Sequence, residues 1–251
     1  MKQNEVILQI KNISKHFGAI KAVDQVSLDI IDGEMHAIIG TNGAGKSTLM
    51  DLICQRTKPS SGQVILMGTD ISKYPPYRIA NMGMNKCFQV SKLFGRLTAM
   101  ENVRMALIKK KGKVFNFAPQ EPSFMRDEAL EILGTVGLRE AADEISALMS
   151  YGDQRRLEIA ITLALEPRIL ILDEPTAGVA RAEGYDIMKM IRALAQEKNM
   201  TVIFIEHDME IVFNYADRIS VMINGKLLAT GTPEEVENNE FVQSAYIGGE
   251  E

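Results

Sequence analysis

The segment GTNGAGKS, residues 40–47, decides the fold, because it places three glycines, a lysine and a hydroxyl residue directly after the apolar run MHAII. It matches the pattern G-x-x-x-x-G-K-[ST] through Gly40, Gly45, Lys46 and Ser47. Glycine allows backbone angles that turn several N–H groups onto one anion, and a helix N-terminus adds partial positive charge there. The segment therefore predicts a phosphate-binding loop between an apolar strand and the helix that begins with KSTLMDLICQ.

The phosphate loop implies a nucleotide and a metal ion. In loops of this pattern the lysine reaches the β- and γ-phosphates and the hydroxyl residue ligates Mg²⁺. We therefore expect ATP and Mg²⁺ as cofactors, with Lys46 on the phosphates and Ser47 on the metal. A glycine-rich turn that matches by accident is the alternative, which the flanking strand and helix disfavour. The loop residues expected to bind the nucleotide are Gly40, Asn42, Gly43, Ala44, Gly45, Lys46, Ser47 and Thr48.

Two acids end a second strand. The run ILILDE, residues 169–174, carries Asp173 and Glu174 at its carboxyl end. Strands and helices alternate after Pro167, which predicts a parallel sheet whose carboxyl ends share one edge with the phosphate loop. We expect Asp173 to hold Mg²⁺, through water, and Glu174 to polarise the attacking water. The alternative is an acidic strand end that only leads into the turn EPTAG.

A histidine ends a third strand at the same expected edge. His207 lies in VIFIEHD, just after the apolar run VIFI, and is one of three histidines in the chain. A lone histidine is more often structural, but its place at this edge favours a contact with the γ-phosphate. For His16 and His36 we keep the structural interpretation.

The spacing of apolar residues changes along the chain. Residues 5–40 and 62–72 contain short β-like runs that predict an antiparallel sheet beside the phosphate loop, and residues from about 92 to 165 show helical spacing of apolar residues. Near the C-terminus, RISVMINGKLLATG predicts a hairpin with Asn-Gly at its turn. The fold class predicted is α/β, with a parallel sheet as its main layer.

Composition limits the possible functions. The chain has 251 residues, 46% hydrophobic, and a formal net charge of −5, which argues against nucleic acid as a partner. It has no run of about 18 apolar residues, so we expect a cytoplasmic protein, which leaves docking on a membrane protein open. Cys54 and Cys87 lie in apolar surroundings and are expected to be buried thiols.

The segment MSYGDQRRLEIAITLALEP, residues 149–167, provides a second helix N-terminus suited to an anion. Ser150 is a good N-cap and Gly152 would let a phosphate approach the backbone. With SYGDQ before ILILDEP and after GTNGAGKS, the chain resembles an ATP-binding cassette protein over nearly its whole length. That resemblance implies a head-to-tail pair of cassettes, in which Ser150, Gly152 and Gln154 of one subunit close over ATP held by the other. The expected partner is the same or a paralogous chain.

The resemblance extends to other positions. It implies that Gln89, in KCFQV, contacts Mg²⁺ and the γ-phosphate and links them to the membrane subunit, and that His207 is the switch histidine. It also implies that Phe17 packs against adenine, where a core phenylalanine is the alternative. Ala180 departs from the family pattern, which has Asp or Asn there, and this puts the usual hydrogen bond across the dimer in doubt.

The implied architecture is a single cassette over residues 1–251, with a P-loop NTPase core, an antiparallel β subdomain and an inserted α-helical subdomain. The core and β subdomain would comprise residues 1–88 and 160–251, and the helical subdomain residues 89–159. Leu93, Phe94, Leu97 and Met100 are expected to form a partly exposed apolar patch near Gln89 for a permease helix.

Among cassettes, the chain resembles those of importers for branched-chain and other hydrophobic amino acids, or for amides such as urea, through SYGDQRRLEIA, LFGRLTAMENV, EPTAG and IEHDM. This implies an ATPase bound to permease subunits on the cytoplasmic face of the inner membrane and served indirectly by a periplasmic solute-binding protein. Two alternatives stay open: a cassette for lipid or lipopolysaccharide export, and an ABC ATPase without a permease. The solute and the direction of transport are not encoded in these motifs.

Overall fold

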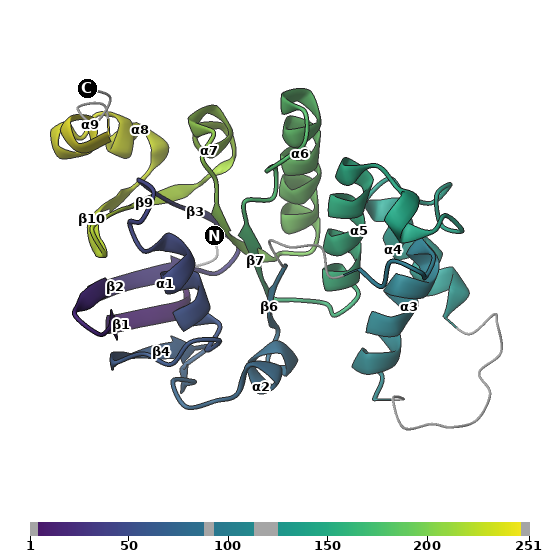
Figure 1. Cartoon of the computed structure of the whole chain (residues 1–251), viewed down its shortest axis with the longest axis horizontal. Helices are drawn as coiled ribbons and strands as arrows, with labels where there is room; N and C mark the ends of the chain where they lie inside the picture. The colour runs from purple at the N-terminus through teal and green to yellow at the C-terminus, as the bar shows by residue number, and fades with distance from the viewer. Residues whose placement is uncertain (1–4, 88–92, 113–124, 247–251) are drawn as a thin grey trace.

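The computed structural model describes residues 5–87, 93–112 and 125–246, which form two sheets and a group of helices (Figure 1). The first sheet has the order β2-β1-β4-β5 and the second the order β10-β9-β3-β8-β7-β6. Gln89 and most of the loop that follows residue 111 lie outside the described residues.

The six-stranded sheet carries the phosphate loop. Its central strands pair in parallel, and β9 and β10 form the antiparallel hairpin that Asn-Gly predicted. Every residue of β3, β7 and β8 is buried, as is usual for parallel strands that are covered on both faces. The strands are β3 (Met35–Gly40), β6 (Met84–Lys86), β7 (Ile169–Asp173), β8 (Thr201–Ile205), β9 (Arg218–Ile223) and β10 (Lys226–Gly231).

Strand register aligns the three functional strand ends. Ile205 of β8 pairs with Ile38 on one side and with Asp173 on the other. The residues that follow these positions therefore leave the sheet at one edge: the phosphate loop after Gly40, and the turns after Asp173 and Ile205.

The four-stranded sheet is antiparallel and lies beside helix α1 (Figure 1). Alternate apolar residues of β1 and β2 pack with Leu49 and Ile53 of α1 and with Ile171 and Ile203 of the parallel sheet. This packing holds the first turn of α1 against the sheet edge. The elements are β1 (Val6–Phe17), β2 (Ile20–Ile31), β4 (Ser61–Leu66), β5 (Thr69–Asp70) and α1 (Lys46–Ile53).

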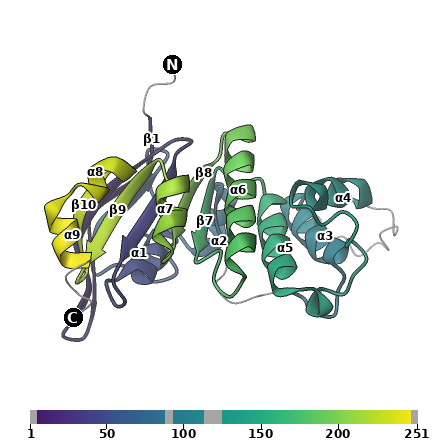
Figure 2. The same cartoon turned by 90° about the horizontal axis from the view of Figure 1, so that it is seen from above.

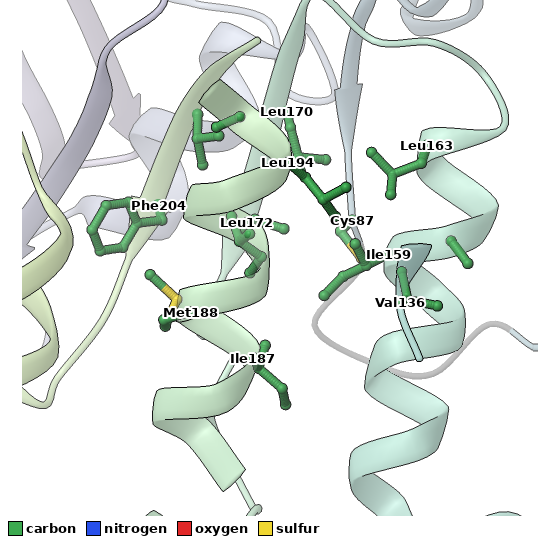
Figure 3. Close-up of a cluster of buried hydrophobic side chains, with 14 of the residues drawn as sticks. Cys87, Val136, Ile159, Leu163, Leu170, Leu172, Ile187, Met188, Leu194 and Phe204 are labelled. Atoms are coloured by element: carbon green, nitrogen blue, oxygen red, sulfur yellow. The ribbon is translucent and has the colours of Figure 1, made fainter. Parts of the chain in front are cut away.

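The helices other than α1 and α2 form a second core with the other face of β7 and β8, whereas Ile79 of α2 packs in the first core. Figure 3 shows Ile187 and Met188 of α6 beside Leu172 of β7, with Ile159 of α5 close to Cys87. The helices are α2 (Pro76–Asn81), α3 (Ala99–Lys110), α4 (Arg126–Thr135), the 3-10 turn Ser146–Leu148, α5 (Tyr151–Leu163), α6 (Arg181–Glu197), α7 (Met209–Tyr215), α8 (Pro233–Glu237) and α9 (Glu240–Tyr246).

The predicted α/β class is confirmed: a parallel sheet, an antiparallel sheet and a group of helices are all present. Both cysteines are buried, as expected, and burial raises the pKa of Cys54 to about 12. His36 is also buried, between Glu34 and Ser220, so its structural interpretation fits. The division into residues 1–88 with 160–251 and residues 89–159 stays a prediction.

Candidate active site

The phosphate loop requires glycine at two positions because backbone approaches both closely. A Cβ on Gly40 would lie 2.3 Å from Met222 O, and a Cβ on Gly45 would lie 2.2 Å from Ala22 O. Gly45 is also the N-cap of α1 and has φ 96°, in the left-handed region that favours glycine. The loop is therefore fixed between β9 and β2, with the first turn of α1 directly behind it.

Lys46 lies across this loop. Its Nζ donates hydrogen bonds to Gly40 O at 2.7 Å and to Thr41 O at 3.1 Å. Burial lowers the pKa of Lys46, and the carboxylates of Glu174 and Asp173 oppose that shift. The Lys46 side chain thus lies at the mouth of the loop, close to the acids predicted to share its site. Ser47 is exposed and Thr48 half-buried at the start of α1.

Asp173 has one paired and one unpaired oxygen. Its Oδ2 accepts a hydrogen bond from Lys86 Nζ at 2.9 Å, whereas its buried Oδ1 has no hydrogen-bond partner among the described residues. An unpaired buried carboxylate oxygen is costly unless a cation or its bound water completes it. The Asp173 carboxylate and the Ser47 hydroxyl in the first turn of α1 are oxygen donors of the kind that Mg²⁺ prefers.

Lys86 is a residue that the sequence analysis missed. Its ammonium is nearly buried and also lies 3.2 Å from Asp51 Oδ1 of α1. Burial alone would lower the pKa of Lys86, but the hydrogen bond and charge of Asp173, with the charge of Asp51, raise it. Lys86 therefore ties the end of β7 to the helix behind the phosphate loop. A lysine inside the strand MNK was the only available signal.

Glu174 and His207 meet at the sheet edge. His207 Nε2 lies 3.0 Å from Glu174 Oε1, and both side chains are partly exposed. Glu174 has φ 52°, in the left-handed region, and its N–H donates to Ile205 O at 3.0 Å. Strained backbone of this kind persists where neighbouring structure fixes it, often at functional sites. The predicted convergence of the acids and the histidine is thus present in the structure.

A further acid, Glu206, lies between these two loops. It is 4% exposed and accepts hydrogen bonds from Thr176 and from the backbone of His207. The sequence carries one signal for this acid, a charged residue between the buried strand VIFI and His207.

The N-terminus of α5 carries Ser150, Gly152 and Gln154, the residues expected to close over ATP held by a second subunit. Ser150 caps the helix, as predicted, by accepting a hydrogen bond from Asp153 N at 3.1 Å. A Cβ on Gly152 would lie 1.7 Å from Glu183 Oε1, so a larger residue there would require the Glu183 side chain of α6 to move. Gln154 Nε2 donates to Met149 O at 3.1 Å.

This helix end is not brought to the phosphate loop. In both views α1 and α5 are separated by β7 and α6 (Figure 2). The structure therefore assembles the loop, Asp173, Glu174 and His207 in one place, and it leaves Ser150, Gly152 and Gln154 in another.

Phe17 ends β1, beside the turn into β2. Its side chain is 52% exposed, and Lys15 Nζ lies 5.0 Å from the ring centroid. The alternative of a core phenylalanine is therefore wrong. An exposed ring at the strand pair that supports Gly45 remains available for stacking.

The N-termini of α1 and α5 and the carboxyl ends of β3, β7 and β8 have the arrangement of an ATP-binding cassette. The model of the family described as ABC transporter matches residues 23–177, and the chain belongs to that family. Its members bind and hydrolyse ATP, and this chain is an ATP-binding ATPase subunit of that class. No described helix has the length and apolar character to cross a membrane.

Particular relatives share nearly the full length. The chain is 37% identical over 252 residues to LivG of Escherichia coli K12, a high-affinity branched-chain amino acid transport ATP-binding protein, covering 98% of this chain and 99% of LivG. A solved cassette of an ABC transporter in its ADP conformation superposes with a TM-score of 0.85 at 32% identity, covering 97% and 99% of the two chains. A dimeric post-hydrolysis cassette bound to ADP and Pi gives 0.78 at 29% identity, covering 90% and 98%.

Proposed function

We propose that this chain hydrolyses Mg-ATP to drive uptake of branched-chain or other hydrophobic amino acids through a membrane permease. The convergence of Lys46, Asp173, Glu174 and His207 at one sheet edge carries the hydrolytic part of this proposal. The amino acid part is supported by the similarity to LivG over nearly both whole chains. The proposed location is the cytoplasmic face of the plasma membrane, where such a permease would hold it.

Each site residue has its own role in the proposed hydrolysis of ATP. Lys46 and the N–H groups of the loop hold the triphosphate, while Ser47 and Asp173 hold Mg²⁺. The metal supplies positive charge to the phosphate oxygens. Glu174 accepts a hydrogen bond from the attacking water and polarises it. His207, whose ring contacts Glu174, is proposed to contact the γ-phosphate. Gln89, outside the described residues, is proposed to contact the metal and γ-phosphate beside them.

A second cassette completes the site in this proposal. Ser150, Gly152 and Gln154 do not reach the phosphate loop of their own chain, so we assign the capped N-terminus of α5 to ATP on a partner. The dimeric solved cassette bound to ADP and Pi supports this arrangement. The partner is the same or a paralogous chain, and Phe17 would stack on adenine in each subunit.

An apolar groove supports the permease contact. A cavity of about 1120 Å³ lies between α2, β6, α3 and α5, and Tyr77, Phe94 and Met105 line it with exposed side chains. Two turns of helix, roughly 11 Å long and 10 Å across, fit such a volume. One part of the expected patch is wrong: Met100 is only 3% exposed, because it lies on the inner face of α3 and packs in the core.

Uptake by cells tests the proposal. The chain should be expressed with its permease subunits and a solute-binding protein in a strain that lacks branched-chain amino acid transport, and uptake of labelled leucine measured. We expect ATP-dependent leucine uptake that Lys46→Ala abolishes, with no gain in labelled ribose uptake. Stable co-purification with ribosomes or nucleic acid in place of a permease would overturn the transporter assignment.

A further inference from the structure

Glu206 connects the two loops that carry the hydrolytic residues. It follows the last residue of β8 and its side chain is almost fully buried. Oε1 accepts hydrogen bonds from Thr176 N at 2.9 Å and Thr176 Oγ1 at 2.7 Å, and Oε2 accepts one from His207 N at 3.2 Å. One carboxylate therefore binds the loop after β7 through one oxygen and the loop after β8 through the other.

These bonds close a ring of contacts. Thr176 is two residues after Glu174, and His207 directly follows Glu206. The ring is completed by the 3.0 Å contact between His207 Nε2 and Glu174 Oε1. All four side chains line one hollow of about 360 Å³ at the sheet edge. A shift of either loop relative to the other would thus change the Glu174–His207 contact.

A carboxylate is well suited to this position. Burial raises the pKa of Glu206, while the bonds from Thr176 and His207 act in the opposite direction. Three donors face the two oxygens, and an ionised carboxylate only accepts, so its charge state matches all three hydrogen bonds. Burying this charge would be unfavourable without those donors.

We propose that Glu206 is a positioning residue for ATP hydrolysis, which fixes Glu174 relative to His207 by holding Thr176 and the His207 backbone together. The inference rests on the proposed function, because it assigns Glu206 a role in that reaction. Glu206 does not touch substrate; it acts through the two residues that do. A misplacement of about 1 Å at reacting groups can lower a rate roughly 100-fold.

Replacement of Glu206 by glutamine tests whether its carboxylate positions the site or only fills a buried position. Glu206→Gln keeps the shape but has one acceptor oxygen, so its NH₂ group must face either the Thr176 donors or the His207 N–H. We expect kcat for ATP hydrolysis to fall roughly tenfold or more, with KM for ATP changed less than about twofold, since the phosphate loop is untouched.

Glu34→Gln is the matched control. Glu34 is also a buried carboxylate that accepts a backbone N–H, from Ile31 at 2.9 Å, but it precedes β3 at the opposite end of the sheet. Both variants should lose thermal stability, and only Glu206→Gln should lose kcat. Equal kcat in the two variants at equal loss of stability would show that Glu206 is only structural and would overturn the inference.

A second pair of variants covers the case in which Glu206→Gln does not fold. Thr176→Val removes the 2.7 Å hydroxyl contact with Glu206 and keeps the backbone bond, while Thr176→Ser keeps both. We expect kcat to fall in the valine variant and to remain near wild type in the serine variant. Wild-type kcat in Thr176→Val would count against the inference. Absence of ATP hydrolysis by the wild-type chain would instead contradict the proposed function itself.

Discussion

His207 Nε2 lies 3.0 Å from Glu174 Oε1, although the two residues are 33 positions apart in the chain. A carboxylate only accepts hydrogen bonds, so the ring nitrogen that faces it carries the hydrogen. The contact with His207 therefore fixes the Glu174 carboxylate at the sheet edge, where the proposed mechanism uses it to orient the attacking water.

Glu174→Gln should separate nucleotide binding from hydrolysis. Glutamine keeps the size of the side chain and an oxygen for His207, but it loses the negative charge and the basicity. General-base assistance contributes about 100-fold to 10,000-fold, so we expect hydrolysis to fall by at least roughly 100-fold. Binding of Mg-ATP should be unchanged, and the variant should accumulate as a dimer with trapped ATP.

Size-exclusion chromatography with ATP measures this outcome. Lys46→Ala is the comparison, because it removes the ammonium that lies across the phosphate loop. It should lose nucleotide affinity and stay monomeric. Hydrolysis by Glu174→Gln at the wild-type rate would remove Glu174 from the proposed role, and absence of both turnover and dimers would weaken the two-cassette site.

Ser150→Arg should abolish hydrolysis while the isolated subunit still binds nucleotide. The arginine would fill the space that a partner's triphosphate needs at the N-terminus of α5, whereas α1 and its loop are unaffected. The change also removes the N-cap bond to Asp153 N, which costs about 1 kcal/mol.

Ser150→Ala controls for that loss, because it removes the cap without adding bulk. We expect the alanine variant to be destabilised by a similar amount and to retain much more activity than the arginine variant. Nucleotide binding would be followed by equilibrium dialysis of the monomer. If Ser150→Arg prevented binding by the monomer, α5 would serve its own phosphate loop.

The sequence predicted the sheet edge well, for a physical reason. Parallel strands are continuous apolar runs, so the residue type changes sharply where each strand ends, and those ends lie together. The phosphate loop, Asp173, Glu174 and His207 all carry that local signal, and all of them lie at the edge formed by β3, β7 and β8.

The buried charges could not be predicted in the same way. Glu206 depends on Thr176, 30 residues earlier, and Lys86 depends on Asp173, 87 residues later. In the sequence, a charged residue next to a strand indicates only where the strand ends, because its distant partner is not known. The Glu183 carboxylate that lies against Gly152 is likewise 31 residues away in the chain, and the phosphate contact expected of Gly152 stays a prediction.

Phe94→Glu should uncouple transport from ATP hydrolysis. Phe94 is 57% exposed in the apolar groove, so a charge there should disfavour a permease helix without disturbing the core. Basal hydrolysis by the purified subunit should be unchanged, and leucine uptake by the assembled transporter should be lost. Phe241→Glu is the control, because Phe241 is 73% exposed on α9, outside the groove. Unimpaired uptake with Phe94→Glu would place the docking site elsewhere.

Ala180→Ser should stabilise the folded chain. Ala180 is the N-cap of α6, with φ −63° and ψ 146°, but its methyl group cannot accept a hydrogen bond from the first turn. A serine in this conformation can, which is worth about 1 kcal/mol, or a rise in Tm of about 2–4 °C for a chain of this size. The exposed position leaves room for the hydroxyl.

Ala182→Ser tests whether the gain belongs to the cap, since serine two residues further along lies inside the helix and should lower stability slightly. Calorimetry of the two variants beside wild type decides the matter: equal Tm shifts would mean that residue 180 does not act as a cap.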